Sequence, residues 1–255
     1  MNRTVVFVHG LRTSSSLWDF QVERLAARGW RCIAPDLPGH GTRRDEPFTA
    51  RAAMGTIRDA LEAGADGEPA HLVGCSLGGM LAIHAAAESP GMVRSLVAAG
   101  CSTQPGRRGA AAYGTLVKLF DRAGEGPLHR VLGREGAEAY LRKGRAGFNA
   151  ITAGVRAVAE FDLLADLAQI DAPVTILNGR FDQFRGQERR FARAARRGRL
   201  VVLGYGTHMV NLTHPEPYTD KLEQLLLEAP LPATSTAAAH AATGEPATRG
   251  GEASA

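Results

Sequence analysis

Ser76 lies in the segment His71 to Met80, whose sequence is HLVGCSLGGM. The apolar residues before the serine have the pattern of a buried strand, and the residues from Leu77 onward have the pattern of a helix. Ser76 is therefore expected at a strand-to-helix turn, where the backbone is held in an uncommon and strained conformation. Gly74 and Gly78 remove the side chains that would collide across so sharp a bend. Such a turn would lift the serine hydroxyl above the strand ends, at the positive end of a helix.

A serine in this position has two interpretations. It could be a nucleophile, provided that a nearby base takes the proton from its hydroxyl. It could also be an ordinary helix cap. The pattern Gly-x-Ser-x-Gly is by itself a weak signal for the first interpretation, so the surrounding elements decide between the two.

Short apolar runs alternate with amphipathic segments along most of the chain. This alternation predicts an α/β fold, with a mostly parallel sheet of about six strands and helices on both faces. The predicted strands are residues 4–9, 31–35, 70–75, 94–100, 173–179 and 199–204, and the predicted helices are residues 17–28, 50–63, 77–88, 184–197 and 210–228.

Two segments break this alternation. Between about residues 104 and 169 there are helix-like pieces but no strand pattern, and this stretch is too long for a connecting loop. We interpret residues 104–165 as a helical cap inserted into a core made of residues 1–103 and 166–229. Residues 230–255 contain almost no large apolar side chain. They cannot bury enough surface to offset the loss of chain entropy, so we expect a disordered tail.

Five motifs, in order along the chain, resemble those of the α/β-hydrolase family. The segment around Ser76 resembles the family's nucleophile elbow, and VFVHGLRTSSSLWDF resembles its oxyanion-hole loop. APDLPGHG resembles the Asp-x-Pro-Gly-His-Gly turn that follows the next strand. NGRFDQF and LGYGTHMVNLTHPE resemble the segments that carry the family's acid and histidine. The match covers about residues 4–228, which leaves no room for the family's two leading strands, so we expect the fold to lack its leading hairpin.

The resemblance implies a catalytic triad of Ser76, His208 and Asp182. His208 would take the serine proton, and Asp182 would hold the imidazole in the required tautomer. The backbone N–H groups of Leu11 and Leu77 would form the oxyanion hole. Trp18, Phe181 and Met209 lie near the motif loops in the sequence, and they are the candidates for contact with substrate.

Each assignment has an alternative. Asp182 could instead be a turn former, although no other carboxylate follows a predicted strand between the serine and the histidine. His214 could replace His208 as the base, but it stands inside the pattern that opens the last helix. We interpret His9 and His40 as structural residues that bond the loop backbone, and His71, His84 and His129 as surface or core residues.

Composition limits the other classes of function. The three cysteines are widely spaced, so we expect reduced thiols. No cysteine or histidine cluster has metal-ligand spacing, so we expect no metal. No glycine pattern other than the elbow indicates a cofactor, so we expect none. Residues 185–199 are rich in arginine, but apolar residues recur among them at helical spacing. This pattern favours an amphipathic helix with a solvated basic face over a nucleic-acid surface. With no apolar run of 18 residues and no signal peptide, we expect a cytoplasmic protein without a membrane partner.

The sequence therefore predicts a serine hydrolase that cleaves a small ester, thioester or related acyl compound through an acyl-enzyme. Hydrolysis of a carbon–carbon bond, perhydrolysis and a lyase reaction are alternatives on the same triad, and a ligand-binding protein with a vestigial triad is an alternative of another class. A serine at the elbow argues against the family's epoxide hydrolases and haloalkane dehalogenases, which carry aspartate there. The motifs do not name the substrate. Residues 104–160 hold eight arginines and two lysines against five carboxylates, which fits either an anionic substrate or a solvated surface. The oligomeric state stays open.

Overall fold

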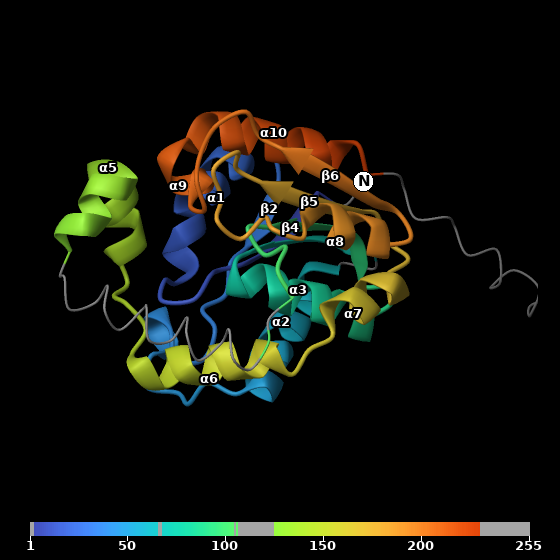
Figure 1. Ribbon diagram of the computed structural model, residues 1–255, viewed down its shortest axis with the longest axis horizontal. Coiled ribbons are helices and arrows are strands. Elements are labelled where there is room, and N and C mark those ends of the chain that lie inside the picture. The colour runs from blue at the N-terminus through green and yellow to red at the C-terminus, as the bar shows by residue number, and fades with distance from the viewer. Residues whose placement is uncertain (1–2, 66–67, 105, 107–124, 230–255) are drawn as a thin grey trace, which may run out of the picture.

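A parallel six-stranded sheet forms the centre of the protein (Figure 1). The computed structural model describes residues 3–65, 68–104, 106 and 125–229, so the expected tail and part of the expected cap lie outside the described residues. The strand order is β2-β1-β3-β4-β5-β6, and every pairing is parallel. The strands are β1 Thr4–Val8, β2 Arg31–Ile33, β3 Ala70–Cys75, β4 Val93–Ala99, β5 Val174–Asn178 and β6 Gly198–Val202. The predicted α/β fold, with its mostly parallel sheet of about six strands, is confirmed.

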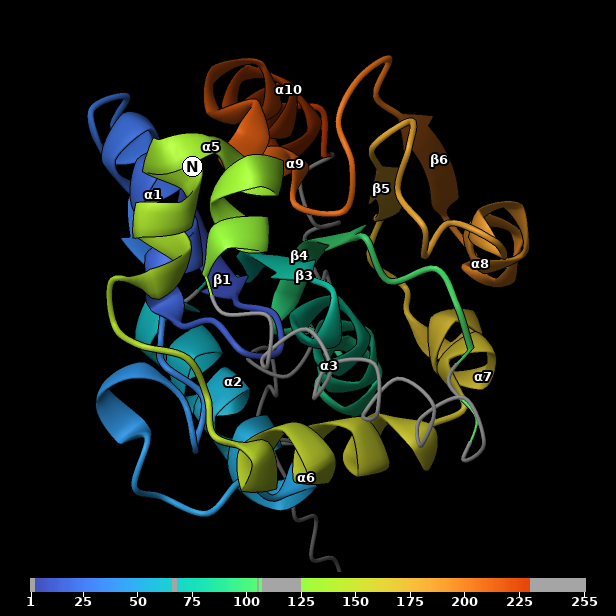
Figure 2. The same cartoon turned by 60° about the vertical axis from the view of Figure 1, so that its left-hand side comes forward.

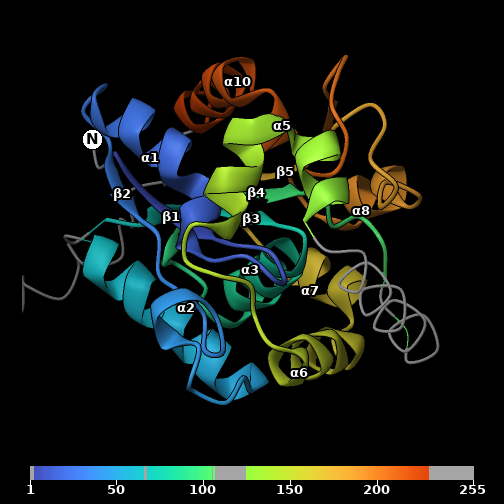
Figure 3. The same ribbon diagram turned by 90° about the vertical axis from the view of Figure 1, so that its left-hand side faces the viewer.

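Helices cover both faces of the sheet (Figures 1 and 3). One face packs against α2 Ala50–Ala65, α3 Leu77–Glu88, α7 Leu163–Gln169 and α8 Glu188–Ala194. The other face packs against α1 Asp19–Ala26, α9 Val210–Thr213 and α10 Pro215–Leu227. Two short 3₁₀ helices, η1 Ser15–Trp18 and η2 Gly41–Arg43, follow the first two strands.

Alternate residues of each buried strand supply the two cores. In β1, Val6 and Val8 point to the core beneath α2 and α3, whereas Val5 and Phe7 point to the core beneath α1 and α10. All four side chains are fully buried. Because both faces are covered, the strand is apolar at every position, which is why it has a continuous apolar run in the sequence.

Helices α5 (Gly126–Leu141) and α6 (Phe148–Ala159) fall within the expected cap. The arrows of β5 and β6 point toward the side of the molecule on which α5 lies (Figure 1). Helix α5 packs against η1 and α9, and α6 packs against α2 and α3 (Figure 2). Helix α7 crosses the expected boundary at residue 165 and packs against α3 and α8. The division into core and cap stays a prediction.

The predicted bounds of two helices are wrong. The helix expected over residues 210–228 is divided into α9 and α10 at His214, which has φ −138° and ψ 60°. His214 precedes Pro215, and the ring of a proline disfavours helical geometry in the residue before it. The helix expected over residues 184–197 begins only at Glu188, after a turn, and ends at Ala194.

Candidate active site

Ser76 occupies the turn between β3 and α3, as the sequence predicts. It has φ 55° and ψ −122°, a conformation that costs a non-glycine residue about 1–3 kcal/mol. Its N–H donates to the carbonyl of Ala99 on the neighbouring strand at 2.8 Å, which ties the turn to the sheet. Helix α3 begins at Leu77, so the N–H groups of its first turn have no carbonyl four residues earlier in the helix. These N–H groups give the turn a positive potential.

The start of α3 lies against the end of β1. A Cβ atom on Gly78 would lie 2.3 Å from the carbonyl oxygen of Val8 and 2.4 Å from that of His9, so only glycine fits. A Cβ atom on Gly10 would lie 3.4 Å from Cβ of Ser76. The loop after β1 and the serine are therefore neighbours. Strands β1 and β3 are adjacent although β2 separates them in the sequence, and such a switch point is where open α/β sheets bind ligands.

Asp182 and His208 come together beyond β5 and β6. The Nδ1 atom of His208 lies 3.2 Å and 3.3 Å from the two carboxylate oxygens of Asp182. The aspartate side chain is 1% exposed and the histidine side chain is 14% exposed. The backbone N–H of Phe184 donates to Asp182 Oδ1 at 2.8 Å, and its ring lies edge-on to the imidazole at 4.7 Å. The carboxylate is thus fixed by the turn that follows it, and the imidazole is held from two sides.

Gly100, which follows β4, lies against Asp182 and His208. A Cβ atom there would lie 3.0 Å from both Asp182 Oδ2 and His208 Nδ1. Among the residues that the structure describes, no hydrogen bond joins Ser76 to His208. Catalytic hydrogen bonds of ligand-free enzymes are often long and shorten only when substrate binds. The arrangement thus contains the contact between His208 and Asp182 and presents Ser76 at the same end of the sheet.

A polar network that sequence reasoning missed supports the Asp182 loop. The amide of Asn178, at the end of β5, donates to Ser102 Oγ and to Glu188 Oε2, both at 2.9 Å. Arg185 pairs with Glu188 at 2.8 Å. A polar amide at the end of an otherwise apolar strand was the signal in the sequence, because a buried amide needs partners.

His214 fits the role of base poorly. Its Nδ1 atom contacts the hydroxyl of Thr213 at 2.9 Å, and its ring lies 5.0 Å from that of Tyr205. In the described part of the chain, no carboxylate lies within ion-pair distance of it. Cys75 sits beside Ser76 but is 3% exposed, and burial raises the pKa of its thiol to about 12. A thiol with so high a pKa does not supply a thiolate at neutral pH.

The three residues expected to contact substrate differ in how far their side chains are exposed to solvent. Trp18 is fully buried, and its ring lies 4.9 Å from Phe7 in the core beneath α10, so we correct its placement from the substrate site to the core. Phe181 is 66% exposed beside Arg180. Met209 is partly buried next to His208.

Helix α6 contacts the two residues whose N–H groups were expected to face the substrate. A Cβ atom on Gly154 of α6 would lie 3.1 Å from Cδ1 of Leu11 and 3.3 Å from Cδ2 of Leu77. Leu77 is 4% exposed, whereas Leu11 is only partly buried. The side chains of this pair therefore form the surface on which α6 rests.

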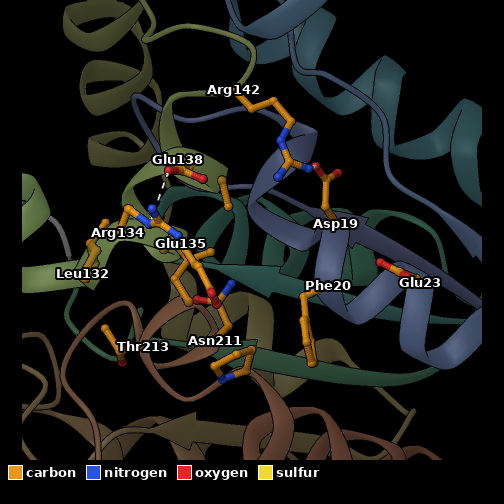
Figure 4. Close-up of a pocket in the computed structure, with 15 residues that line it drawn as sticks. Asp19, Phe20, Glu23, Leu132, Arg134, Glu135, Glu138, Arg142, Asn211 and Thr213 are labelled. Carbon is orange, nitrogen blue, oxygen red and sulfur yellow. Dashed lines mark hydrogen bonds and ion pairs between the residues drawn. The ribbon is translucent and has the colours of Figure 1, made fainter.

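A cavity of about 520 Å³ lies between α1, α5 and α9 (Figure 4). Its walls include Phe20, Leu132 and Asn211, together with the ion pair of Arg142 and Asp19 at 2.5 Å. Ser76, Asp182 and His208 are not among the described residues that line it. This cavity is therefore separate from the candidate active site.

Ion pairs take up part of the positive charge of α5 and the segment after it. Arg142 pairs with Asp19, Arg145 pairs with Glu125 at 3.3 Å, and Arg134 lies 3.9 Å from Glu138. This neutralisation weakens the argument from composition for an anionic substrate. Helix α8 buries Phe191 and Ala192 and exposes its arginines, as expected of an amphipathic helix.

The described residues contain no group of three or more histidine, cysteine, aspartate or glutamate side chains that could hold a metal ion. Their three cysteines are unpaired thiols. In the same residues, no helix combines the length and the hydropathy needed to cross a membrane.

Known proteins resemble the chain over most of its length. A pimeloyl–acyl-carrier protein methyl ester esterase of Nitrosomonas europaea is 30% identical over 245 residues, which cover 87% of this chain and 94% of the relative. A putative carbamate hydrolase of Agrobacterium fabrum is 26% identical, with 89% and 94% covered. The crystal structure of a putative non-heme bromoperoxidase of Mycobacterium tuberculosis is 20% identical, has a TM-score of 0.73 and covers 90% of this chain and 94% of its own, which shows a shared fold. The model of the alpha/beta hydrolase family matches residues 5–221, and the chain therefore belongs to this family of enzymes.

Proposed function

We propose that the protein is a serine hydrolase that cleaves a carboxylic ester or a related acyl compound through an acyl-enzyme intermediate. The observation that carries the proposal is the contact between His208 Nδ1 and the buried carboxylate of Asp182, at the end of the sheet where the elbow presents Ser76. An acid, a base and a strained nucleophile in the family's order are the parts that acyl transfer requires.

The first step uses the two nitrogen atoms of His208 separately. Its Nδ1 atom donates to Asp182, which leaves Nε2 free to accept a proton. Nε2 takes the proton of the Ser76 hydroxyl as the oxygen attacks the acyl carbon. The imidazolium then donates that proton to the departing alcohol, and Asp182 stabilises its charge. Water repeats both steps on the acyl-enzyme and releases the acid.

Backbone donors would stabilise the tetrahedral intermediates. The N–H of Leu77 stands at the first position of α3, where the helix provides no carbonyl for it. The N–H of Leu11, in the loop beside Ser76, would be the second donor. Loss of a single donor of this kind lowers kcat by about 10²–10³ in a well-studied serine protease.

The relatives and helix α6 bear on the substrate class. By their names, the two relatives act on a methyl ester and on a carbamate, which both carry a carbonyl bonded to a leaving heteroatom. Helix α6 rests on Leu11 and Leu77, so an acyl group attached to Ser76 and extending past these two side chains would meet this helix. We therefore infer a small ester whose acyl group is selected by α6 and its surroundings.

A fluorophosphonate probe and an ester panel test the proposal together. The wild-type protein should be labelled at Ser76 and should hydrolyse p-nitrophenyl or methyl esters, while Ser76→Ala should lose both properties. A protein that binds ligands with a vestigial triad would give neither labelling nor turnover. Retention of wild-type turnover by Ser76→Ala on every ester found would refute the proposal.

A further inference from the structure

A buried carboxylate lies beside the loop of residues 10–16. Asp36, which follows β2, is 7% exposed and accepts the backbone N–H of Ser15 at 2.7 Å. Its other oxygen accepts the N–H and the hydroxyl of Thr42, at 2.9 Å and 2.8 Å. Burial by itself would raise the pKa of Asp36, but the hydrogen bonds from Thr42 and Ser15 outweigh burial and lower it to about 2. The carboxylate is therefore ionised at neutral pH and holds the far end of the loop.

The near end of the same loop is held by His9. Its Nε2 atom accepts the backbone N–H of Leu37 at 3.0 Å, so Nδ1 carries the proton and donates to the carbonyl of Gly10 at 2.9 Å. Burial lowers the pKa of His9 to about 3, so the ring is neutral at neutral pH. The turn that begins at Asp36 thus fixes both ends of the loop that contains Leu11.

A lysine between α5 and α6 completes this arrangement. The Nζ atom of Lys143 lies 2.5 Å from Ser15 Oγ and 3.8 Å from Asp36 Oδ2. Its backbone carbonyl accepts a hydrogen bond from Arg44 at 2.8 Å. In Figure 3 the yellow-green segment that joins α5 to α6 runs beside the blue loop that follows β1. The lysine therefore links this segment to the loop and to its buried anchor.

We propose that Lys143 is a positioning residue that holds the loop of residues 10–16 in the geometry needed for the oxyanion donor at Leu11. The inference rests on the proposed function, because it concerns how a donor of that same site is placed. The ammonium offsets the charge of Asp36 and orients the Ser15 hydroxyl, so it adds a side-chain link from the α5–α6 segment to the loop whose ends Asp36 and His9 hold. Its contribution belongs to the transition state, since the ester carbonyl needs the donor most when its oxygen becomes negative.

The neighbouring ion pair supplies a matched control. Arg142 also joins this segment to the core, but its ion pair is with Asp19, which lies outside the loop of residues 10–16. Lys143→Met and Arg142→Met each keep an unbranched apolar stem and remove one cation. Lys143→Met should lower kcat about tenfold, less than the loss of a donor itself, with KM changed by less than about twofold. Arg142→Met should leave kcat within about twofold of wild type.

A mutant cycle separates positioning from folding. Ser15→Ala removes the hydroxyl that contacts Lys143 and Asp36 but keeps the N–H bound to Asp36, so it should lower kcat at least as much. Lys143→Met in that background should cost little more, because both changes break one link. Lys143→Arg, which keeps the charge, should restore part of kcat. Should Lys143→Met not fold, the comparison of Ser15→Ala with wild type decides the matter.

The decisive measurements are kcat, KM and the rate of Ser76 labelling by a fluorophosphonate, whose phosphoryl oxygen needs the same donors. Slower labelling together with lower kcat and unchanged KM supports the inference. Wild-type kcat in Lys143→Met and Ser15→Ala, or an equal loss in Arg142→Met, overturns it while the proposed function stands. Full turnover by Ser76→Ala shows instead that the proposed function is wrong, and the inference falls with it.

Discussion

At the scale of single residues, the proposed role of His208 depends on its contact with Asp182. Ser76→Ala and His208→Ala should each lower kcat by about 10⁴-fold or more, and the double variant should be little slower than either, because the three residues act as a unit. Asp182→Asn should cost about 10⁴-fold with the fold intact, since an amide supports the wrong tautomer of the imidazole. Steady-state kinetics on one ester, with circular dichroism to verify folding, measure all four variants.

His214 is the control for this prediction. Its partner is the hydroxyl of Thr213, so His214→Ala should keep kcat within about threefold of wild type. If His214→Ala abolished turnover and His208→Ala did not, the assignment of the base would be reversed.

Gly100 makes a second prediction at this scale. It has φ 59°, and a Cβ atom there would press on Asp182 and His208. Gly91 has φ 87° but has no atom within 4 Å of its Cβ position. Alanine at either position carries the strain of a positive φ, about 1 kcal/mol, so both variants should lose similar stability. Only Gly100→Ala should also lower kcat. We expect a decrease of tenfold or more, which corresponds to an activation barrier raised by about 1.4 kcal/mol. Equal kcat values in the two variants would show that the contact is unimportant.

At the scale of elements, helix α6 is expected to control which acyl groups reach the serine. Gly154→Val should push the side chains of Leu11 and Leu77 aside and lower kcat/KM for large acyl groups more than for acetate. Gly147, at the N-cap of the same helix, has φ −68° and open space at its Cβ position. Gly147→Ala therefore serves as the control and should keep the wild-type preference. A panel of p-nitrophenyl esters of increasing chain length measures the effect, and an unchanged ranking in Gly154→Val would count against α6 as the selective element.

Elements were predictable where a local pattern determines them and not where a distant contact does. The strands and the elbow at Ser76 follow from apolar runs and glycines, so the sequence places them well. The late start of α8 depends on the hydrogen bond from Phe184 N–H to Asp182, which no periodicity reveals. Trp18 was expected near substrate because it follows a motif loop, but its direction is set by packing against Phe7. The contact of Lys143 with Ser15 joins residues 128 positions apart and leaves no pattern in the sequence.

At the scale of the whole molecule, buried histidines make the fold sensitive to acid. His9 and His71 are 0% and 2% exposed, and burial lowers the pKa of each to about 3. Below pH 6.5 the unfolded chain binds protons on these histidines while the folded chain does not, so stability falls as pH decreases from 6.5 toward 3. These two groups give a slope of about 2.7 kcal/mol per pH unit once the unfolded chain is fully protonated there. Burial also lowers the pKa of His40, which is 0% exposed, so His40 adds to this slope in the same direction.

Urea unfolding at several pH values between about 5.5 and 4.5 measures that slope. His71→Gln, which cannot titrate, should lower the slope by about 1.4 kcal/mol per pH unit, whatever its effect on stability at pH 7. His84 is a suitable control, because it is partly exposed and lies near Asp166 and Glu88. A slope unchanged by His71→Gln would show that acid acts through other groups.

The order of the elements along the chain also determines when Ser76 and His208 are synthesised. Ser76 follows the third strand along the chain, whereas His208 follows β6, an edge strand that pairs with β5. A ribosome therefore releases the proposed nucleophile long before the proposed base, and a nascent chain that stops short of β6 contains Ser76 without His208. Edge strands also separate from a sheet more readily than central ones. If Ser76 and His208 act together as proposed, hydrolytic activity is the last property that the chain acquires during synthesis and the first that it loses when the β6 edge separates from the sheet.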